Sequence, residues 1–379
     1  MFFDEDNDNE LKEYSDAYIF AMSLVPIRII RRQFENGKEE IIWNNDIPSS
    51  VSLSRPIKLI FSKENAQLTR AEVSKMEAEI QKLVPTKLSV KGVDLKIAAK
   101  LVLSMVDTKV VNDVAGTHSQ QCYICLRSGK LLNKTVGAQA FNVPDVLKYV
   151  FSPLHARIRT MELLLNISYR LTLPKPSWRV SKSNTILKDR QASIRLALKE
   201  QLGLRLNEPL PGGGNSNDGN TARRFFSEVD AVAEITGLNK NILFRFGILL
   251  TVVNSNREID IEAFEAFARE THEIYRELYD WYVLSPTVHK LLLHSSNIMR
   301  TAALPLGMLS EEAQETRNKC IRKFREHHSR KFSRIVNIED VFKRLLLTSD
   351  PVISLNNRRT AQCESLSHLP TEARKLIKH

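Results

Sequence analysis

The chain has 379 residues, of which 42% are hydrophobic, so it is long enough to bury the cores of two domains, or of one domain with a large insertion. Its formal net charge of +11 favours an acidic partner, nucleic acid first and a membrane surface second. The sequence has no apolar run that would span a bilayer, no secretory signal pattern and only four cysteines, which favours an intracellular protein over a membrane protein or a disulfide scaffold.

The first half of the chain predicts a modest α/β core. Residues 1–16 are acidic and we expect them to be disordered. Residues 17–31, 39–43 and 55–62 are rich in β-branched and aromatic residues and predict strands. Apolar spacing near 3.6 predicts a helix over residues 69–84, beginning at Thr69. Residues 93–107 then predict a mostly buried strand that ends at Asp107, and together these elements indicate a mixed sheet.

From about residue 143 the pattern becomes helical in nearly every segment. We expect helices within residues 153–171, 222–235, 241–253, 261–283, 310–332 and 338–347. Residues from 350 onward have weak periodicity and predict a flexible tail.

The stretch GGGNSNDGNTARRFF, residues 212–226, has two readings. Its Gly, Asn, Ser and Asp residues are typical of turns and would suit a plain interdomain linker. Alternatively, Asn220 or Thr221 caps a helix whose first backbone N–H groups, with Arg223 and Arg224, attract a phosphate. Two arginines in a first turn oppose the helix dipole unless an anion lies nearby, which supports the second reading.

Cysteine and histidine pairs suggest a metal site. Cys122 and Cys125 have the spacing of two ligands of one tetrahedral ion, and His289 and His294 would complete a Cys₂His₂ set. A five-residue step on a continuous helix turns two side chains apart, so the histidines need a bend or a helix end between them. A redox pair or an accidental one, with solvated histidines, is the alternative.

Carboxylates in two distant segments are candidates for a catalytic metal site. Asp107 ends the predicted strand. Glu311, Glu312 and Glu315 lie near the start of a predicted helix together with Arg317, Lys319, Arg322 and Lys323. A nuclease needs such separated carboxylates to hold two divalent cations, whereas a solvated charged face with a Glu315–Lys319 pair is the simpler reading.

Seven short motifs in one order resemble Transib-family transposases and, more distantly, the catalytic subunit of the RAG recombinase. They are SLVPIRI, SMVDTKV, CYIC, LHARIR, GGGNSNDGNTARRFF, HKLLLH and SEEAQETRNK, and the resemblance covers about residues 16–349. It implies an RNase H-like α/β core with an Asp-Asp-Glu triad and a large, mostly helical insertion stapled by zinc. The family cleaves double-stranded DNA with Mg²⁺ or Mn²⁺ and transfers the cut strand.

The resemblance assigns roles to particular residues. It makes Asp107 the second acid and Glu315 the third, with Glu312 if the register slips. It implies a structural Zn²⁺ on Cys122, Cys125, His289 and His294. It places Gly219, Asn220, Arg223 and Arg224 near DNA, and the basic helix with Lys319, Arg322 and Lys323 extends that surface. His155 also matches a family position, where we expect a packed histidine.

One departure bears on activity. The family's first Asp follows an apolar strand and precedes glycine, whereas only MFFDEDNDNELKEY stands before the first matching motif here. We therefore expect a truncated, nuclear endonuclease-like recombinase that is weak or inactive, and homodimeric by analogy. The alternative is a non-enzymatic, zinc-stabilised protein that binds DNA or a partner. The expected parts are residues 17–118 (core), 119–300 (insertion), 301–349 (catalytic helices) and 350–379 (tail).

Overall fold

The structure is a computed structural model that describes residues 18–32, 37–102, 105–135, 149–181, 184–210, 216–356 and 368–378. The acidic start lies outside these ranges. The chain divides into two compact units, one of Met1–Val102 with Glu311–Gln362 and one of Leu103–Ser310 with Cys363–His379. The predicted core and catalytic helices thus fall mainly in the first unit and the insertion in the second. Residues 103–118, which we expected in the core, belong to the second unit.

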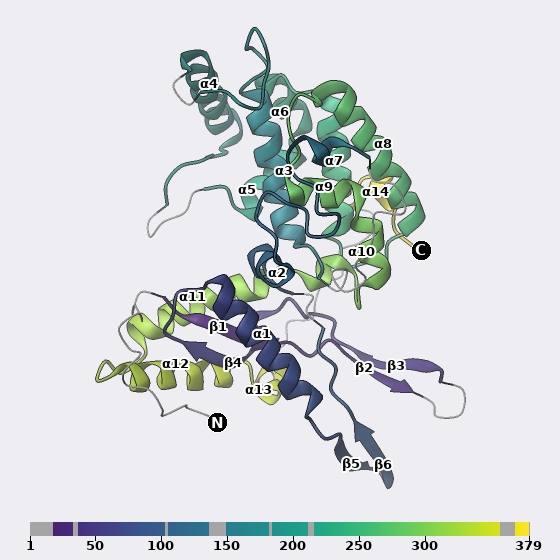
Figure 1. Ribbon diagram of the computed structural model, residues 1–379, viewed down its shortest axis with the longest axis vertical. Coiled ribbons are helices and arrows are strands. Elements are labelled where there is room, and N and C mark those ends of the chain that lie inside the picture. Colours follow the sequence, from purple (N-terminus) through teal and green to yellow (C-terminus); the bar gives the residue numbers. More distant parts are fainter. Residues whose placement is uncertain are drawn as a thin grey trace. The chain divides into compact units, whose positions relative to one another are not determined.

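Strands in the described part of the first unit form antiparallel pairs (Figure 1). The strand β1 (Phe20–Leu24) pairs with β4 (Arg55–Ile60), β2 (Arg28–Arg32) with β3 (Glu39–Asn44), and β5 (Thr86–Val90) with β6 (Val93–Ile97). Strand locations at residues 20–60 are confirmed, but these pairs do not join into a mixed sheet within the described residues. An RNase H-like core therefore stays a prediction.

The predicted buried strand over residues 93–107 is wrong. Lys91 and Gly92 both have positive φ, 51° and 80°, which is the geometry of a two-residue hairpin turn. This turn pairs β6 with β5, and β6 ends at Ile97 with every residue exposed. Asp107 instead caps a helix, α2 (Thr108–Ala115).

Helices of the first unit pack on the β1–β4 pair. The helix α1 (Ala66–Gln81) begins three residues before Thr69, because the Asn65 side chain accepts the N–H of Leu68 at 2.9 Å. Buried Ile321, Val341 and Leu345 join α11 (Glu312–His327) and α12 (Arg334–Thr348) to residues of β1 and β4. The short elements η2 (Val51–Leu53) and α13 (Pro351–Asn356) complete the described part of this unit.

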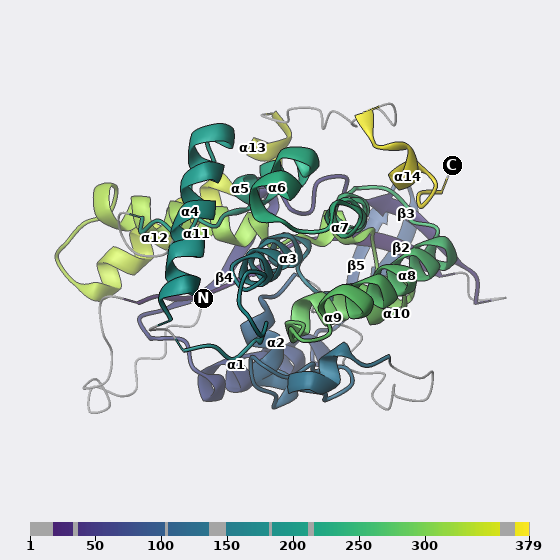
Figure 2. The same cartoon turned by 90° about the horizontal axis from the view of Figure 1, so that it is seen from above.

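The second unit is helical, as predicted. Its helix α3 contacts α5, α7 and α9, and Figure 2 shows α3 among them. Most of these helices begin where Ser, Asn or Asp caps the first turn, as Ser152 does for α3 and Asn239 does for α7. Besides α2 and a short helix near the end of the chain, the described helices of this unit are α3 (Pro153–Ser168), α4 (Thr185–Leu202), α5 (Gly219–Ser227), α6 (Val229–Thr236), α7 (Lys240–Val253), α8 (Ile261–Tyr279), α9 (Pro286–Leu293) and α10 (Ser295–Thr301), with the 3₁₀ helices η3 (Gly129–Asn133) and η6 (Leu306–Leu309).

The end of the chain differs from the flexible tail expected from sequence. The helix α14 (Thr371–Arg374) contacts α7, and Leu376 and Ile377 are buried. Ile377 forms a β-bridge with Ile259, and Lys378 donates its N–H to the carbonyl of Glu258 at 2.9 Å. Residues 357–367 lie outside the described ranges. Within those ranges, each helix is too short or too polar to cross a membrane.

Candidate metal centre

His289 and His294 come together because a helix ends between them. The helix α9 stops at Leu293, and His294 adopts φ −127° and ψ −8° before α10 begins. A helix end between the two histidines is what their five-residue spacing requires if both are to face one point. The two Nε2 atoms lie 3.1 Å apart, and both side chains are fully buried. The sequence HKLLLH therefore presents two imidazoles to one point.

The two cysteines sit on a tight turn. The carbonyl of Cys122 accepts the N–H of Leu126 at 2.8 Å, and the N–H of Cys122 donates to the carbonyl of Arg127 at 2.9 Å. Leu126 has φ 57°, in the left-handed region that a branched side chain rarely adopts. Such a conformation persists only where the surroundings impose it, and it is common at ligand sites. Cys122 is buried and Cys125 is half-buried.

All four side chains form one cluster. Their ligand atoms lie within 4.8 Å of one another, and Cys125 Sγ is 3.3 Å from His289 Nε2. Zinc bonds of ~2.3 Å to sulfur and ~2.05 Å to nitrogen, arranged as a tetrahedron, would place S and N about 3.6 Å apart and two N about 3.3 Å apart. The cluster is therefore compatible with a zinc ion. Four protein donors leave no position for water, which is typical of a structural site.

A second layer of contacts orients His289. Its Nδ1 lies 2.7 Å from the carbonyl of Leu132, so Nδ1 carries the proton and the lone pair of Nε2 faces the cluster. Leu132 is held by its neighbour Asn133, which is buried. Asn133 Nδ2 donates to the carbonyls of Asp280, at 3.1 Å, and Tyr282, at 2.9 Å, while its Oδ1 accepts the N–H of Leu284 at 2.8 Å.

Hydrogen bonds and burial favour a thiolate at Cys122 and a neutral ring at His294, whereas the hydrogen bond with Cys122, together with burial, raises the pKa of Cys125. Burial raises the pKa of Cys122, but hydrogen bonds with Cys125, His289 and His294 outweigh this, so the pKa is lowered. Burial also lowers the pKa of His294, which keeps its ring neutral. Lys290 is 1% exposed, with Nζ 4.0 Å above the ring of Tyr123, and burial lowers its pKa to about 8. The negative charge of a Cys122 thiolate partly offsets that burial.

Asn133 and Lys290 did not emerge from the sequence as parts of this site. Asn133 begins the tripeptide Asn-Lys-Thr, which matches a glycosylation sequon, yet its amide is used inside the protein. Lys290 is the one charged residue within the run HKLLLH apart from the histidines. A lysine inside an apolar stretch of this kind is a usable signal of a buried charge.

The predicted catalytic carboxylates belong to different units. Asp107 caps α2, and its Oδ1 accepts the N–H of Lys109 at 3.4 Å. His155, at the start of α3, is half-buried rather than packed in the core, and its Nδ1 lies 3.8 Å from Asp107 Oδ1. Glu315 is exposed on α11. Their meeting across one cleft stays a prediction, and the side chain of Glu312 lies outside the described residues.

The predicted phosphate loop is described only from Ser216 onward, so the glycines at 212–214 are not covered. The helix α5 begins at Gly219 because Asp218, rather than Asn220 or Thr221, accepts the N–H of Thr221 at 2.7 Å. The arginines after this cap differ. Arg224 donates to the carbonyl of Leu202 at the end of α4, where a cation suits the helix dipole. Arg223 is exposed and has no polar partner among the described residues. The dipole argument for a phosphate therefore applies to Arg223 alone.

Gly219 has a packing role. A Cβ atom at this position would lie 2.5 Å from Cδ1 of Leu154, a buried residue of α3. We expect Gly219→Ala to lower the free energy of unfolding by about 1 kcal/mol, because the leucine side chain has to shift in a packed core. Urea unfolding monitored by circular dichroism measures this. The neighbouring change Asn220→Ala, at an exposed position, serves as control, and equal stability of both variants would refute the packing role.

The charged face predicted for residues 310–332 is correct for four side chains and wrong for two, because Glu311 and Arg317 are buried. Glu315, Lys319, Arg322 and Lys323 are exposed on α11. Arg317 is only 1% exposed and points into the first unit, where main-chain carbonyls accept its guanidinium hydrogens. The residues of α11 that are proposed to contact DNA, Lys319, Arg322 and Lys323, are thus all exposed.

Comparison with models of known protein families gives no match, and comparison with curated proteins gives none either. The function is therefore inferred from the residues and their geometry.

Proposed function

We propose that this chain is the catalytic part of a Transib-like, RAG-like DNA transposase-recombinase whose Cys122–Cys125 and His289–His294 pairs hold a structural zinc ion. One observation carries the proposal. Two half-sites separated by 164 positions between Cys125 and His289 form a single cluster. The members of this cluster are the same four residues to which the ordered motifs assign zinc.

The donor set fits zinc. Two thiolates neutralise the charge of Zn²⁺, and two neutral imidazoles complete a tetrahedron without an open position. The ion would join the turn near the start of the helical unit to the α9–α10 junction near its end. Its role is therefore to fold that unit rather than to act on a substrate.

The proposed partner is double-stranded DNA, bound in the nucleus by a homodimer, as the family resemblance implies. The net charge of +11 and the exposed Arg223, Lys319, Arg322 and Lys323 support an acidic partner. Asp107 and Glu315 would hold Mg²⁺ or Mn²⁺, which supplies water activation and stabilises the leaving oxygen. With two carboxylates assigned instead of three, we expect strand cleavage by this chain to be weak or undetectable.

DNA binding is tested by comparing the two arginines of α5. Affinity for duplex DNA should fall with salt for every sequence tested, because phosphate contacts release counterions. We expect Arg223→Ala to flatten the plot of log affinity against log salt by about 0.9, the value for one phosphate contact. Arg224→Ala should leave the slope nearly unchanged, since its guanidinium caps α4. Equal slopes for the wild type and Arg223→Ala would favour the interpretation of residues 212–226 as an interdomain linker.

A second candidate is a zinc-stabilised protein that binds DNA without cutting it. The contacts of Asp107 favour it, since the carboxylate caps α2 and lies beside His155. Nicking of a labelled duplex with Mn²⁺ separates the two, with Glu315→Gln as the matched variant. Cleavage by the wild type that is lost in the variant supports the enzyme and contradicts the second candidate. Binding without cleavage in either protein is the result that the second candidate requires, and it agrees with the first only if two carboxylates leave no activity.

A further inference from the structure

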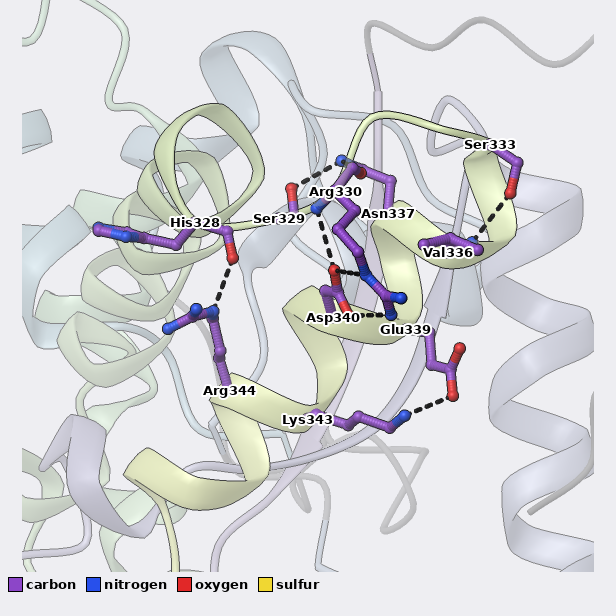
Figure 3. A network of polar contacts seen from close by, with 10 residues as sticks. All are labelled: His328, Ser329, Arg330, Ser333, Val336, Asn337, Glu339, Asp340, Lys343 and Arg344. Carbon is purple, nitrogen blue, oxygen red and sulfur yellow. Dashed lines mark hydrogen bonds and ion pairs between the residues drawn. The ribbon is translucent and has the colours of Figure 1, made fainter.

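A basic hollow of about 650 Å³ lies where α11 ends and α12 begins, entirely within the first unit. Figure 3 shows its polar contacts. The side chains that matter are Arg330, Lys343, Arg344, His327, His328 and Asp340. Three permanent cations thus face one carboxylate. A hollow with this excess of positive charge attracts an anion.

The single carboxylate does not oppose an anion, because it is already neutralised. Asp340 accepts the N–H of Arg330 at 2.9 Å and two guanidinium bonds, from Nε at 3.0 Å and Nη2 at 2.9 Å. These bonds hold the pKa of Asp340 well below its usual range, so the pair persists over the physiological pH range. Arg330 and Asp340 both line the hollow, and Figure 3 shows their contacts with each other.

The loop that frames the hollow is fixed by hydrogen bonds. Asn337 is 7% exposed and donates to Ser329 Oγ at 2.7 Å and to the carbonyl of Arg330 at 3.2 Å. Ser333 caps α12 by accepting the N–H of Val336 at 3.2 Å. A site that is already ordered loses little conformational entropy when a ligand binds.

Arg344 and Lys343 supply the charge that remains. Arg344 Nε donates to the carbonyl of His328 at 2.7 Å, which orients the guanidinium, while its two terminal amino groups make no hydrogen bond to the described residues. Lys343 pairs with Glu339 at 2.6 Å one helical turn away, and its side chain is 57% exposed. Exposed pairs of this kind contribute about 0–1 kcal/mol, so the ammonium is available to an anion.

We propose that this hollow binds a phosphate group through Arg344, with Lys343 adding positive charge to the same hollow. An oriented guanidinium with free amino groups offers the paired donors that phosphate oxygens prefer, and a lysine ammonium contributes a point charge without fixed geometry. The phosphate belongs to the DNA backbone. The assignment of the phosphate to DNA rests on the proposed function, whereas the binding of a phosphate group by this hollow does not.

The test uses the full chain in two arms. In the first, thermal unfolding is followed while inorganic phosphate replaces chloride at constant ionic strength. We expect phosphate to raise the midpoint of the wild type and to have a smaller effect on Arg344→Gln and Lys343→Gln. In the second arm, affinity for a duplex should fall about tenfold in Arg344→Gln, which is the loss of one charge-assisted hydrogen bond. The salt slope should become shallower by about 0.9.

Two comparisons make the outcomes decisive. Lys343→Gln removes a charge without touching the His328 carbonyl, so it tests the site even if Arg344→Gln loosens the α11–α12 turn. Lys75→Gln, at an exposed position of α1, is the control for loss of one charge elsewhere. Variants that match the wild type in both arms would overturn the site. If the variants differ from the wild type with inorganic phosphate but not with DNA, the phosphate site is supported and its assignment to DNA is overturned. If the wild type binds no DNA, the proposed function is contradicted, and the phosphate arm still tests the site.

Discussion

Removal of zinc is expected to unfold the helical unit. Cys122→Ser or His289→Ala should lower its free energy of unfolding by at least about 5 kcal/mol, because structural zinc contributes on the order of 10 kcal/mol to small zinc domains. The loss is larger than that of an ordinary core substitution. On the proposed function, it removes the ion that would join the Cys122–Cys125 turn to the α9–α10 junction, and it leaves buried polar groups without that ion.

Metal analysis and thermal unfolding together measure this effect. Mass spectrometry of the native protein should give one zinc per chain, and both variants should give none. A chelator should lower the unfolding midpoint of the wild type and hardly change that of either variant. Cys320→Ser is the matched control, since Cys320 is a free cysteine of α11 in the first unit, whereas the cluster belongs to the second. Zinc-free wild type with an unchanged midpoint would refute the structural role.

Local structure is the part of this fold that the sequence predicts well. Helices α7, α8 and α9 begin directly after Asn239, Asp260 and Ser285, each of which accepts a first-turn N–H. Helix capping and the 3.6-residue apolar period depend on residues that are close in the chain, so both can be recognised in the sequence. One predicted helix, residues 222–235, is in fact two, because the chain leaves helical geometry at Glu228.

Strand pairing could not be predicted in the same way. The content of β-branched and aromatic residues identifies β1 and β2 but not their partners, which are β4 and β3. The β5–β6 hairpin depends on the positive φ of Lys91, a residue that has no turn preference. Without that turn, the apolar stretch up to Asp107 looked like one buried strand. A continuous apolar run has no period that distinguishes these alternatives.

For the candidate metal cluster, the four clustered side chains could be predicted from the sequence, but the residues that orient them could not. Spacing and motif order indicate Cys122, Cys125, His289 and His294. The support from Asn133 depends on groups 147 to 151 positions away, at Asp280, Tyr282 and Leu284. Hydrogen bonds of this kind form only in the folded protein, so the residues next to Asn133 in the sequence do not indicate them.

Arg317→Met is expected to destabilise the first unit by about 3 kcal/mol. The buried guanidinium donates to the carbonyls of Val51 and Ser54, the latter at 2.8 Å, and to Thr348 Oγ1 at 2.9 Å. It therefore joins α11 to η2 and to the end of α12. Methionine has similar length but no donors, so it leaves carbonyls without partners, at about 1–3 kcal/mol for each buried group.

Denaturant unfolding of the first unit measures this loss, and two further variants locate its cause. Arg322→Met changes the same residue type at an exposed position of the same helix and should alter stability by no more than about 0.5 kcal/mol. Arg317→Lys keeps the charge but loses the planar fork, so it should recover only part of the loss. If Arg317→Met is as stable as Arg322→Met, the carbonyl contacts do not hold α11. Glu315 lies two residues before Arg317 on that helix, so a loosened α11 should also misplace the carboxylate to which the resemblance assigns catalysis.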